Sequence, residues 1–404
     1  MPLNKLANKE RLPELDLFRA FAILGVLHVH ATSYAAGGQA ADSPFYYFFN
    51  LVNIFFKFGT PCFIFLSSFV LFYNYLGRPA GRELVARFYK KRLLYILVPY
   101  AAASVCYYDV AHLFSGEQSF FNTGNSLSAH LVWFAEDLAT GTAYTHLYFV
   151  FINLQFYVLF PLFLLLFQRF PRLIRWSLPA GFLIQWGFAL WNKYDLQLMN
   201  KASYAPTYMS YYLLGAFLAY YFEDVKGWLT RSFRQQSRGG KAITLALWTS
   251  WLAAALVHVQ LYHNGRAYGK WVNSLWYELL WNVHTFLSAF VLLQAAFWVY
   301  RSSSRAAVSF LSRIGALSFA IYLLHPVFLL MYRRLESHFN PESVPYLLWI
   351  WAGVPVSLFL AWGAAAFVFR WVPGASFLLG SKPSGGQEKG KLRAGGQGGK
   401  SAAV

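Results

Sequence analysis

The sequence predicts an all-α, polytopic integral membrane protein with about ten transmembrane helices. Hydrophobic residues make up 57% of the 404 residues and charged residues only 12%, against about 25% charged in ordinary soluble domains. Ten apolar stretches are long enough to cross a bilayer, which takes about 20 residues each. The basic residues between them alternate from loop to loop, which supports the same count.

The predicted spans cover residues 16–34, 46–75, 93–112, 147–167, 173–191, 206–222, 242–261, 279–299, 312–331 and 346–369. If the N-terminus is cytoplasmic, 26 of the 34 basic residues fall in cytoplasmic segments and six in outer loops, while Arg19 and Lys57 lie inside helices. The net charge of +18 therefore indicates topology and not nucleic-acid binding. We expect both termini to be cytoplasmic and the partner to be the lipid bilayer of the plasma membrane.

The chain divides into two predicted parts. Residues 1–372 form the membrane-embedded domain, and residues 373–404, rich in Gly, Lys and Ser without apolar periodicity, are expected to be a disordered basic tail. Cys62 and Cys106 both lie in apolar runs, so neither a disulfide framework nor a metal site is predicted. We find no internal repeat of the kind that marks many secondary transporters.

Arg19 and His30 stand out in the first span, LDLFRAFAILGVLHVHATSY. An Arg in the bilayer core costs roughly 2.5 to 3.5 kcal/mol on insertion scales, and such residues usually face a cavity or other helices. Eleven residues of helix turn through about three turns plus 20° and rise about 16 Å. The two side chains are therefore predicted to share one face, with Arg19 near the cytoplasm and His30 at mid-depth or beyond.

Two further histidines are predicted at a similar depth. His325 lies twelve positions past Arg313, about 18 Å along a continuous ninth helix, and His146 lies at the outer end of the fourth. A shared depth does not show that these side chains touch, and each histidine could instead have a purely structural role. His325 could satisfy carbonyls freed by Pro326, and a histidine at a loop edge is often solvated.

Several segments resemble the acyltransferase family 3 membrane proteins. The run ELDLFRAFAILGVLHVH resembles their first helix, which carries an Arg, ten residues and a His. Over about 15–370, further segments resemble theirs in order, namely FGTPCFIFLSSFVLF, ARFYKKRLLYILVPY, HLYFVFINLQFYVLFPLF, YYLLGAFLAYY and LSRIGALSFAIYLLHPVFL. The chain departs from the family where Ala20 replaces Gly after the Arg and where Ser67, Ser68 and Phe69 replace Ser-Gly-Phe.

The resemblance implies transfer of an acyl group, often acetyl from acetyl-CoA, onto a hydroxyl of a sugar or glycan. Acyl-CoA would then be a co-substrate and not a resident cofactor. We expect no appended soluble hydrolase-like domain, so any extracytoplasmic protein that accepts the acyl group would be a separate chain. The hypothesis assigns catalysis to His30, Arg19 and His325, substrate binding to His146, Trp133 and Ser68, and CoA phosphates to Arg87, Lys91 and Arg92.

In this hypothesis His30 acts as the base toward the acceptor hydroxyl, or carries the acyl group, and Arg19 holds the donor. The cluster around Arg92 could instead be a positive-inside anchor, and Trp133 could simply pack in its loop. Two other functions stay open. Ten helices with polar groups at mid-depth also suit a transporter or exporter, and a subunit of a polysaccharide synthase would tolerate alanine at Arg19 and His30.

Overall fold

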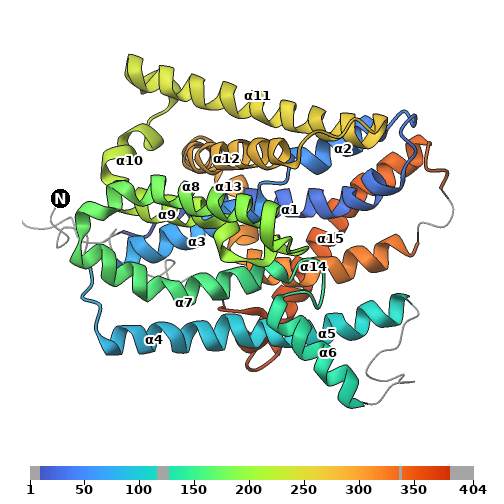
Figure 1. Cartoon of the computed structure of the whole chain (residues 1–404), viewed down its shortest axis with the longest axis horizontal. Coiled ribbons are helices and arrows are strands. Elements are labelled where there is room, and N and C mark those ends of the chain that lie inside the picture. Colours follow the sequence, from blue (N-terminus) through green and yellow to red (C-terminus); the bar gives the residue numbers. More distant parts are fainter. Residues whose placement is uncertain (1–9, 116–126, 336–338, 383–404) are drawn as a thin grey trace, which may run out of the picture.

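A computed structural model describes residues 10–115, 127–335 and 339–382, and within these ranges the chain is helical with no strand. Most of the long helices run roughly parallel in Figure 1, with the N-terminus at one end of the bundle. The helices are α1 (Glu14–Gly38), α2 (Tyr46–Phe55), α3 (Gly59–Tyr75), α4 (Arg82–Arg92), α5 (Val98–Ser115), α6 (Leu127–Thr140), α7 (Tyr148–Arg169), α8 (Ile174–Trp191), α9 (Met209–Tyr220), α10 (Phe222–Thr230), α11 (Arg238–Tyr268), α12 (Ser274–Ser302), α13 (Arg305–Ala316), α14 (Ser318–Arg333), α15 (Val344–Trp371) and α16 (Ser376–Leu379).

Each of the ten predicted spans coincides with helix. Within the described residues, seven segments have the length and composition of a membrane span, namely α1, α2 with α3, α4 to α5, α7, α11, α12 and α15. An eighth is added if the bent pair α13 and α14 counts as one span. The chain is thus an all-α polytopic membrane protein, as predicted, while the count of ten crossings and the side of the termini stay predictions.

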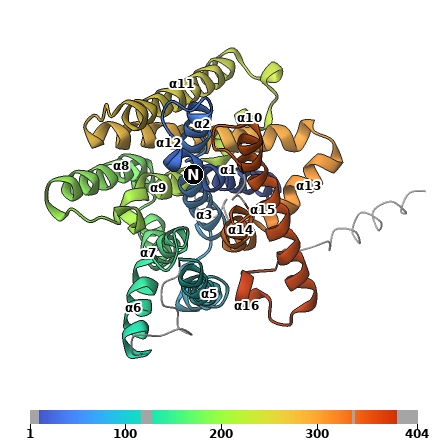
Figure 2. The ribbon, with the colours of Figure 1, turned by 90° about the vertical axis from the view of Figure 1, so that its right-hand side faces the viewer.

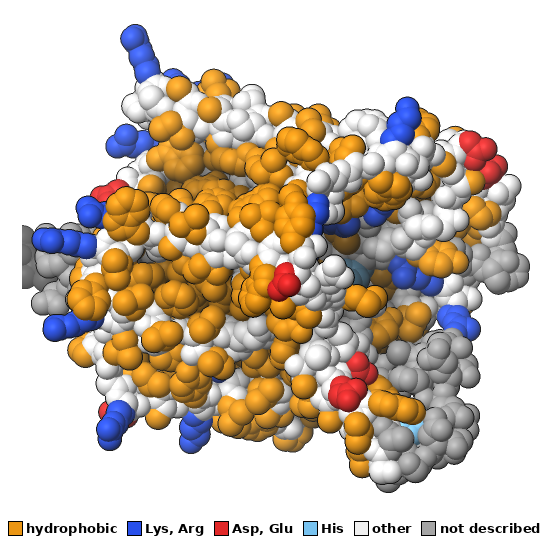
Figure 3. All heavy atoms as spheres, viewed as in Figure 1, with side chains coloured by type: hydrophobic (Ala, Val, Ile, Leu, Met, Phe, Trp, Pro, Cys, Tyr) orange, Lys and Arg blue, Asp and Glu red, His pale blue; other side chains and the backbone are white. Residues whose placement is uncertain are grey.

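The exterior of the bundle is apolar, as a lipid-facing surface must be. Leu183 is 75% exposed and Val158 is 66% exposed, although both lie in the middle of long helices. Figure 3 shows a broad band of hydrophobic side chains across the molecule, with many Lys and Arg side chains at the end where the N-terminus lies. This band would contact the acyl chains of the bilayer.

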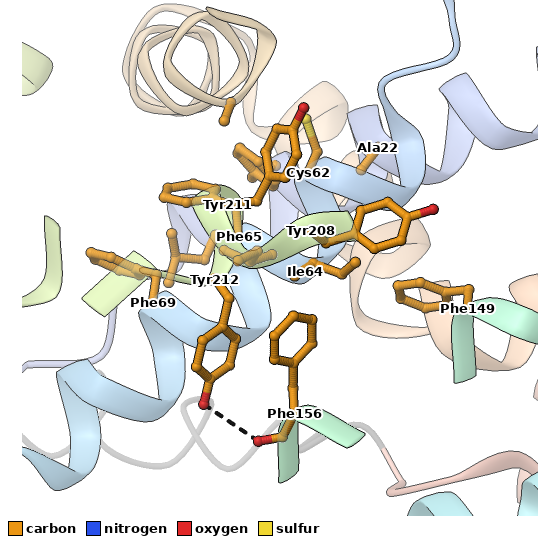
Figure 4. Packing of buried hydrophobic residues seen from close by; sticks show 14 of the residues in the cluster. Ala22, Cys62, Ile64, Phe65, Phe69, Phe149, Phe156, Tyr208, Tyr211 and Tyr212 are labelled. Atoms are coloured by element: carbon orange, nitrogen blue, oxygen red, sulfur yellow. Dashed lines mark hydrogen bonds between the residues drawn. The ribbon is translucent and has the colours of Figure 1, made fainter. Parts of the chain in front are cut away.

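Close helix packing in the middle of the bundle positions the site. Looking along the helices, Figure 2 places α1, α3 and α14 near the centre, with α5, α7, α11 and α15 around them. Helix α3 approaches α9 closely because Gly215 has no side chain, and a Cβ there would lie 2.6 Å from the Phe69 nitrogen. The Tyr212 ring of α9 stacks on Phe156 of α7 with centroids 4.2 Å apart, and its hydroxyl donates to the Phe156 carbonyl (Figure 4).

The ninth predicted span is not one continuous helix. Helices α13 and α14 meet at Leu317 with a bend of 76°, so the depth of His325 cannot be counted from Arg313 as the sequence analysis did. The bend lies where α13 packs on the start of α1. A Cβ on Gly315 would overlap the carbonyl oxygen of Asp16, which shows how closely the two backbones approach.

The packed domain continues beyond the predicted boundary at residue 372. Helix α16 buries Leu379, and the Phe377 ring stacks on Tyr95 with centroids 6.1 Å apart. Disorder was therefore the wrong prediction for residues 373–382, because this short apolar segment finds a partner in the bundle. Residues 383–404 of the predicted tail lie outside the described residues.

Candidate active site

Three histidines from distant parts of the sequence form a row inside the bundle. The ring centroids of His30 and His325 are 5.1 Å apart, and those of His325 and His146 are 5.9 Å apart. The rings come from α1, from α14 and from the segment just before α7. His325 and His146 are fully buried, whereas His30 is half-buried. The contact that depth alone could not establish is therefore present.

The surroundings of His325 fix its orientation. Its Nδ1 lies 3.1 Å from the Ile321 carbonyl oxygen, so Nδ1 is the donor and the neutral ring keeps its lone pair on Nε2. Among the described residues, Nε2 has no hydrogen-bond partner although it is buried. A buried acceptor without a partner costs free energy, and such groups concentrate at sites with a chemical task.

Helix α14 is held in this position although Pro326 interrupts its hydrogen bonding. The Tyr107 hydroxyl of α5 donates to the Leu323 carbonyl at 2.6 Å and accepts from the Val327 nitrogen at 3.3 Å. A neighbouring helix thus supplies the partners that the proline removes, as is usual in membranes. A purely structural role for His325 explains only one of its nitrogens. The ring donates to a backbone carbonyl through Nδ1 and leaves Nε2 available.

His30 faces a cavity of about 410 Å³, which we call the His30 cavity. Its walls include Lys57 and Thr60 from the region of α2 and α3, Tyr148 from α7, and Glu278 from the first turns of α12. The ring of His30 makes no hydrogen bond to any described residue, so both its nitrogens can engage a ligand. The Glu278 carboxylate pairs with Lys201 at 2.5 Å.

Arg19 faces a second cavity of about 220 Å³, the Arg19 cavity. Arg92, Asn153 and Tyr157 also line it, and the Arg19 guanidinium is held by Asp16 at 2.5 Å. Tyr322 is the one residue that lines both the Arg19 cavity and the His30 cavity, within the described part of the chain. Its ring touches His146 and His325, and its hydroxyl donates to the His146 carbonyl.

A basic hollow adjoins the Arg19 cavity at the same end of the bundle. Arg92 lines the Arg19 cavity and also this hollow of about 650 Å³, together with Arg78, Lys91 and Lys382. No Asp or Glu lines the hollow among the described residues. The guanidinium of Arg92 lies over the Tyr157 ring, 4.7 Å from its centroid. Such a cluster is suited to a ligand that carries several phosphates.

Not every predicted residue joins the site. Ser68 is fully buried and donates to the Tyr212 carbonyl, so its hydroxyl serves the packing of α3 on α9. Trp133 is 46% exposed on α6, where it contacts His130, and it lines neither cavity. Arg87 points away and pairs with Glu83 at 3.1 Å. His146 belongs to the histidine row but lines neither cavity, so the structure does not place it in reach of a substrate.

Two residues of the site, Tyr322 and Lys57, were not predicted from the sequence. Tyr322 lies one helical turn before His325 in the run YLLHP, and this spacing places both side chains on one face of α14. The three-residue spacing in this run is therefore a sequence signal for Tyr322. Lys57 was noticed as a cation inside a span, and only the fold shows that it lines the His30 cavity.

Comparisons with known proteins identify the family of the chain. Residues 12–366 match the family model of an acyltransferase domain, acyltransferase family 3. A protein of Staphylococcus aureus strain MSSA476, named a probable poly-beta-1,6-N-acetyl-D-glucosamine export protein, is 25% identical over 67% of this chain and 69% of its own length. The protein of the same name from strain MRSA252 is 24% identical over the same shares. No solved structure matches the chain. The matched region contains the histidine row and both cavities, and the chain belongs to acyltransferase family 3 as a multi-pass membrane acyltransferase.

Proposed function

We propose that this protein is a membrane O-acyltransferase that moves an acyl group, acetyl from acetyl-CoA, onto a hydroxyl of a sugar or glycan. The observation that carries the proposal is the His30–His325 contact beside Tyr322, the residue that lines both cavities. An acceptor in the His30 cavity can contact His30 directly, and a donor in the Arg19 cavity would lie against Tyr322, whose ring touches His325. In this proposal the Arg19 cavity is cytoplasmic and the His30 cavity opens to the outside.

The donor side fits acyl-CoA in charge and position. The phosphates of CoA would bind in the hollow whose charged lining residues are the four cations Arg78, Lys91, Arg92 and Lys382. The pantetheine arm would then pass Arg19 into the narrower Arg19 cavity, whose walls are largely apolar. Its thioester would reach Tyr322, and through it the His30 cavity.

The acceptor side fits base catalysis. The acceptor hydroxyl would lose its proton to His30 while its oxygen attacks the thioester carbonyl. The new C–O bond forms, the C–S bond breaks, and the proton passes from His30 to the departing thiolate of CoA. The His325 Nε2 lone pair can accept a hydrogen bond from one nitrogen of His30, which leaves the other nitrogen of His30 as the base. His325 would then orient the base, and the acceptor hydroxyl would be the nucleophile.

A glycan exporter is the second candidate, and the name of the Staphylococcus aureus relatives favours it. In that case the two cavities would be halves of a passage closed at Tyr322. Acyl transfer needs a base, which an unpartnered histidine nitrogen next to a second imidazole can supply, and residues 12–366 match an acyltransferase domain. The acyltransferase is therefore the function that the geometry supports best.

Mass spectrometry of surface glycans and secreted metabolites tests the proposal in cells with and without the gene. We expect glycans in the deleted strain to lose the mass of an acyl group while their amount outside the cell stays the same. Loss of the glycan from the outside, with its acyl content unchanged, would contradict the acyltransferase proposal and support export.

A further inference from the structure

Two cations lie together next to the His30 cavity. Lys57 lies in the short break between α2 and α3, within an otherwise apolar segment of 30 residues. Its Nζ is 4.9 Å from the centroid of the Tyr262 ring, and the Cζ of Arg266 is 5.1 Å from the same centroid. Both charges therefore share one aromatic ring of α11, although they come from segments more than 200 residues apart.

Neither cation is neutralised by an acid. Among the described residues, Lys57 makes no ion pair and no hydrogen bond, and Arg266 donates one hydrogen bond, to Asn50 Oδ1 at 3.2 Å. Glu278 is the acid that lines the His30 cavity, and Lys201 already pairs with it. A lysine inside an apolar span is costly and usually marks a pathway or a ligand site. The cavity thus carries a positive charge that the described residues leave uncompensated.

Lys57 also connects the His30 cavity to a neighbouring space. It lines both the His30 cavity and an adjoining hollow of about 440 Å³, whose wall includes Arg266, Asn53 and Trp271. We call this space the Arg266 hollow. A molecule held there would extend past Lys57 toward His30. The arrangement gives one end of a ligand two cations and gives its other end a base.

We propose that Lys57 and Arg266 bind an anionic group, phosphate or carboxylate, of the acceptor, and so present one of its hydroxyls to His30. This inference rests on the proposed acyltransferase function and narrows its acceptor to an anionic sugar or a sugar phosphate. Arg266 offers the planar pair of donors that suits either oxyanion, and Lys57 adds a point charge. The substrate that the relatives' name mentions contains N-acetylglucosamine, so the charged acceptor distinguishes this chain from what that name describes.

Binding to the full-length protein tests the inference without relying on catalysis. The protein is placed in nanodiscs of phosphatidylcholine, and quenching of tryptophan fluorescence reports binding, because Trp271 and Trp281 line the two spaces. Glucose 1-phosphate, glucuronate and methyl glucoside are the probes. We expect at least one anionic sugar to bind about tenfold tighter than the neutral one, and the better anion identifies phosphate or carboxylate as the group.

Matched variants locate the effect. Lys57→Met and Arg266→Gln should each remove most of the preference for the anionic sugar, and Lys57→Arg should keep it. Lys270→Met is the control, since Lys270 is exposed at the same end of α11 and lines neither space. Equal binding of charged and neutral sugars, or an unchanged preference in Lys57→Met, would overturn the inference. So would loss of the preference on adding phosphatidylglycerol, because the pair would then be a lipid contact.

The same preparation separates this inference from the proposed function. His30→Ala should retain the preference for the anionic sugar although it cannot acylate. If the wild type acylates sugars but shows no preference for anions, only the anion site is wrong. If it binds the anionic sugar through Lys57 but transfers no acyl group to any sugar, only the acyltransferase proposal is wrong.

Discussion

Replacing His325 with asparagine separates its two ring nitrogens. The asparagine amide can donate to the Ile321 carbonyl much as Nδ1 does, so the anchoring hydrogen bond of α14 is kept. The same substitution removes Nε2, the buried nitrogen that has no partner among the described residues. The variant therefore tests whether His325 serves the chemistry of His30 or only the packing around Pro326.

The catalytic and the structural role of His325 predict different losses of activity. If Nε2 orients His30 or shares its proton, its loss should cost about 100- to 10,000-fold in kcat, the usual contribution of acid–base catalysis, which corresponds to roughly 2.7 to 5.5 kcal/mol of barrier. If His325 only anchors the helix, the conserved bond keeps most of its roughly 1 kcal/mol, and activity should fall by less than about fivefold.

Acetyl transfer from labelled acetyl-CoA, measured with membrane vesicles at matched protein levels, gives the result. His258→Asn is the control, because His258 is equally buried and contacts another histidine, His284, but lines neither cavity. We expect the control to keep wild-type activity. Activity of His325→Asn within fivefold of wild type would refute the role of His325 in catalysis.

Two further predictions concern the donor side and the packing of α1. Arg19→Ala and Arg92→Gln should each raise the KM for acetyl-CoA about tenfold or more, whereas Arg19→Lys should keep part of the affinity because charge survives without the bidentate geometry. Arg87→Gln should change the KM little, since Arg87 lines neither the Arg19 cavity nor the basic hollow. An equal effect of Arg87→Gln would contradict the basic hollow as the CoA site. Gly315→Ala should lower the free energy of unfolding by about 3 kcal/mol, because the added methyl group would overlap the Asp16 carbonyl. Thermal unfolding in detergent measures this loss. Gly363→Ala is the control and should show no comparable loss, because nothing lies within 4 Å of a Cβ at that position.

The class of the fold could be predicted from composition and hydrophobic runs, because a bilayer imposes strong requirements on length and polarity. Arg19 and His30 both lie on the uninterrupted helix α1, as the apolar run indicated, and their depth in a membrane stays a prediction. The bend at Leu317 could not be predicted. It lies next to the close approach of Gly315 to α1, which is a tertiary contact that the apolar run 312–331 does not encode locally.

The contacts within the site depended on which helices are neighbours. The histidines at 30, 146 and 325 were expected at one depth, and the fold brings them into one row because α14 packs beside α1 and the start of α7. Ser68 and Trp133 were also predicted to bind the substrate. Ser68 was chosen for its place in a family motif, and Trp133 because it is an aromatic residue in a predicted outer loop. Their surroundings, a helix interface and an exposed surface, were outside what the sequence could tell.

Acyl transfer across the membrane by the wild type and by His30→Ala tests the central claim most directly. Proteoliposomes enclose the sugar acceptor, labelled acetyl-CoA is added to the side on which Arg19 and the basic hollow open, and the acylated sugar is measured inside. We predict label on the enclosed sugar for the wild type, none for His30→Ala, and equal insertion of both proteins. Acylation that persists in His30→Ala would contradict the assignment of His30 as the base between two cavities.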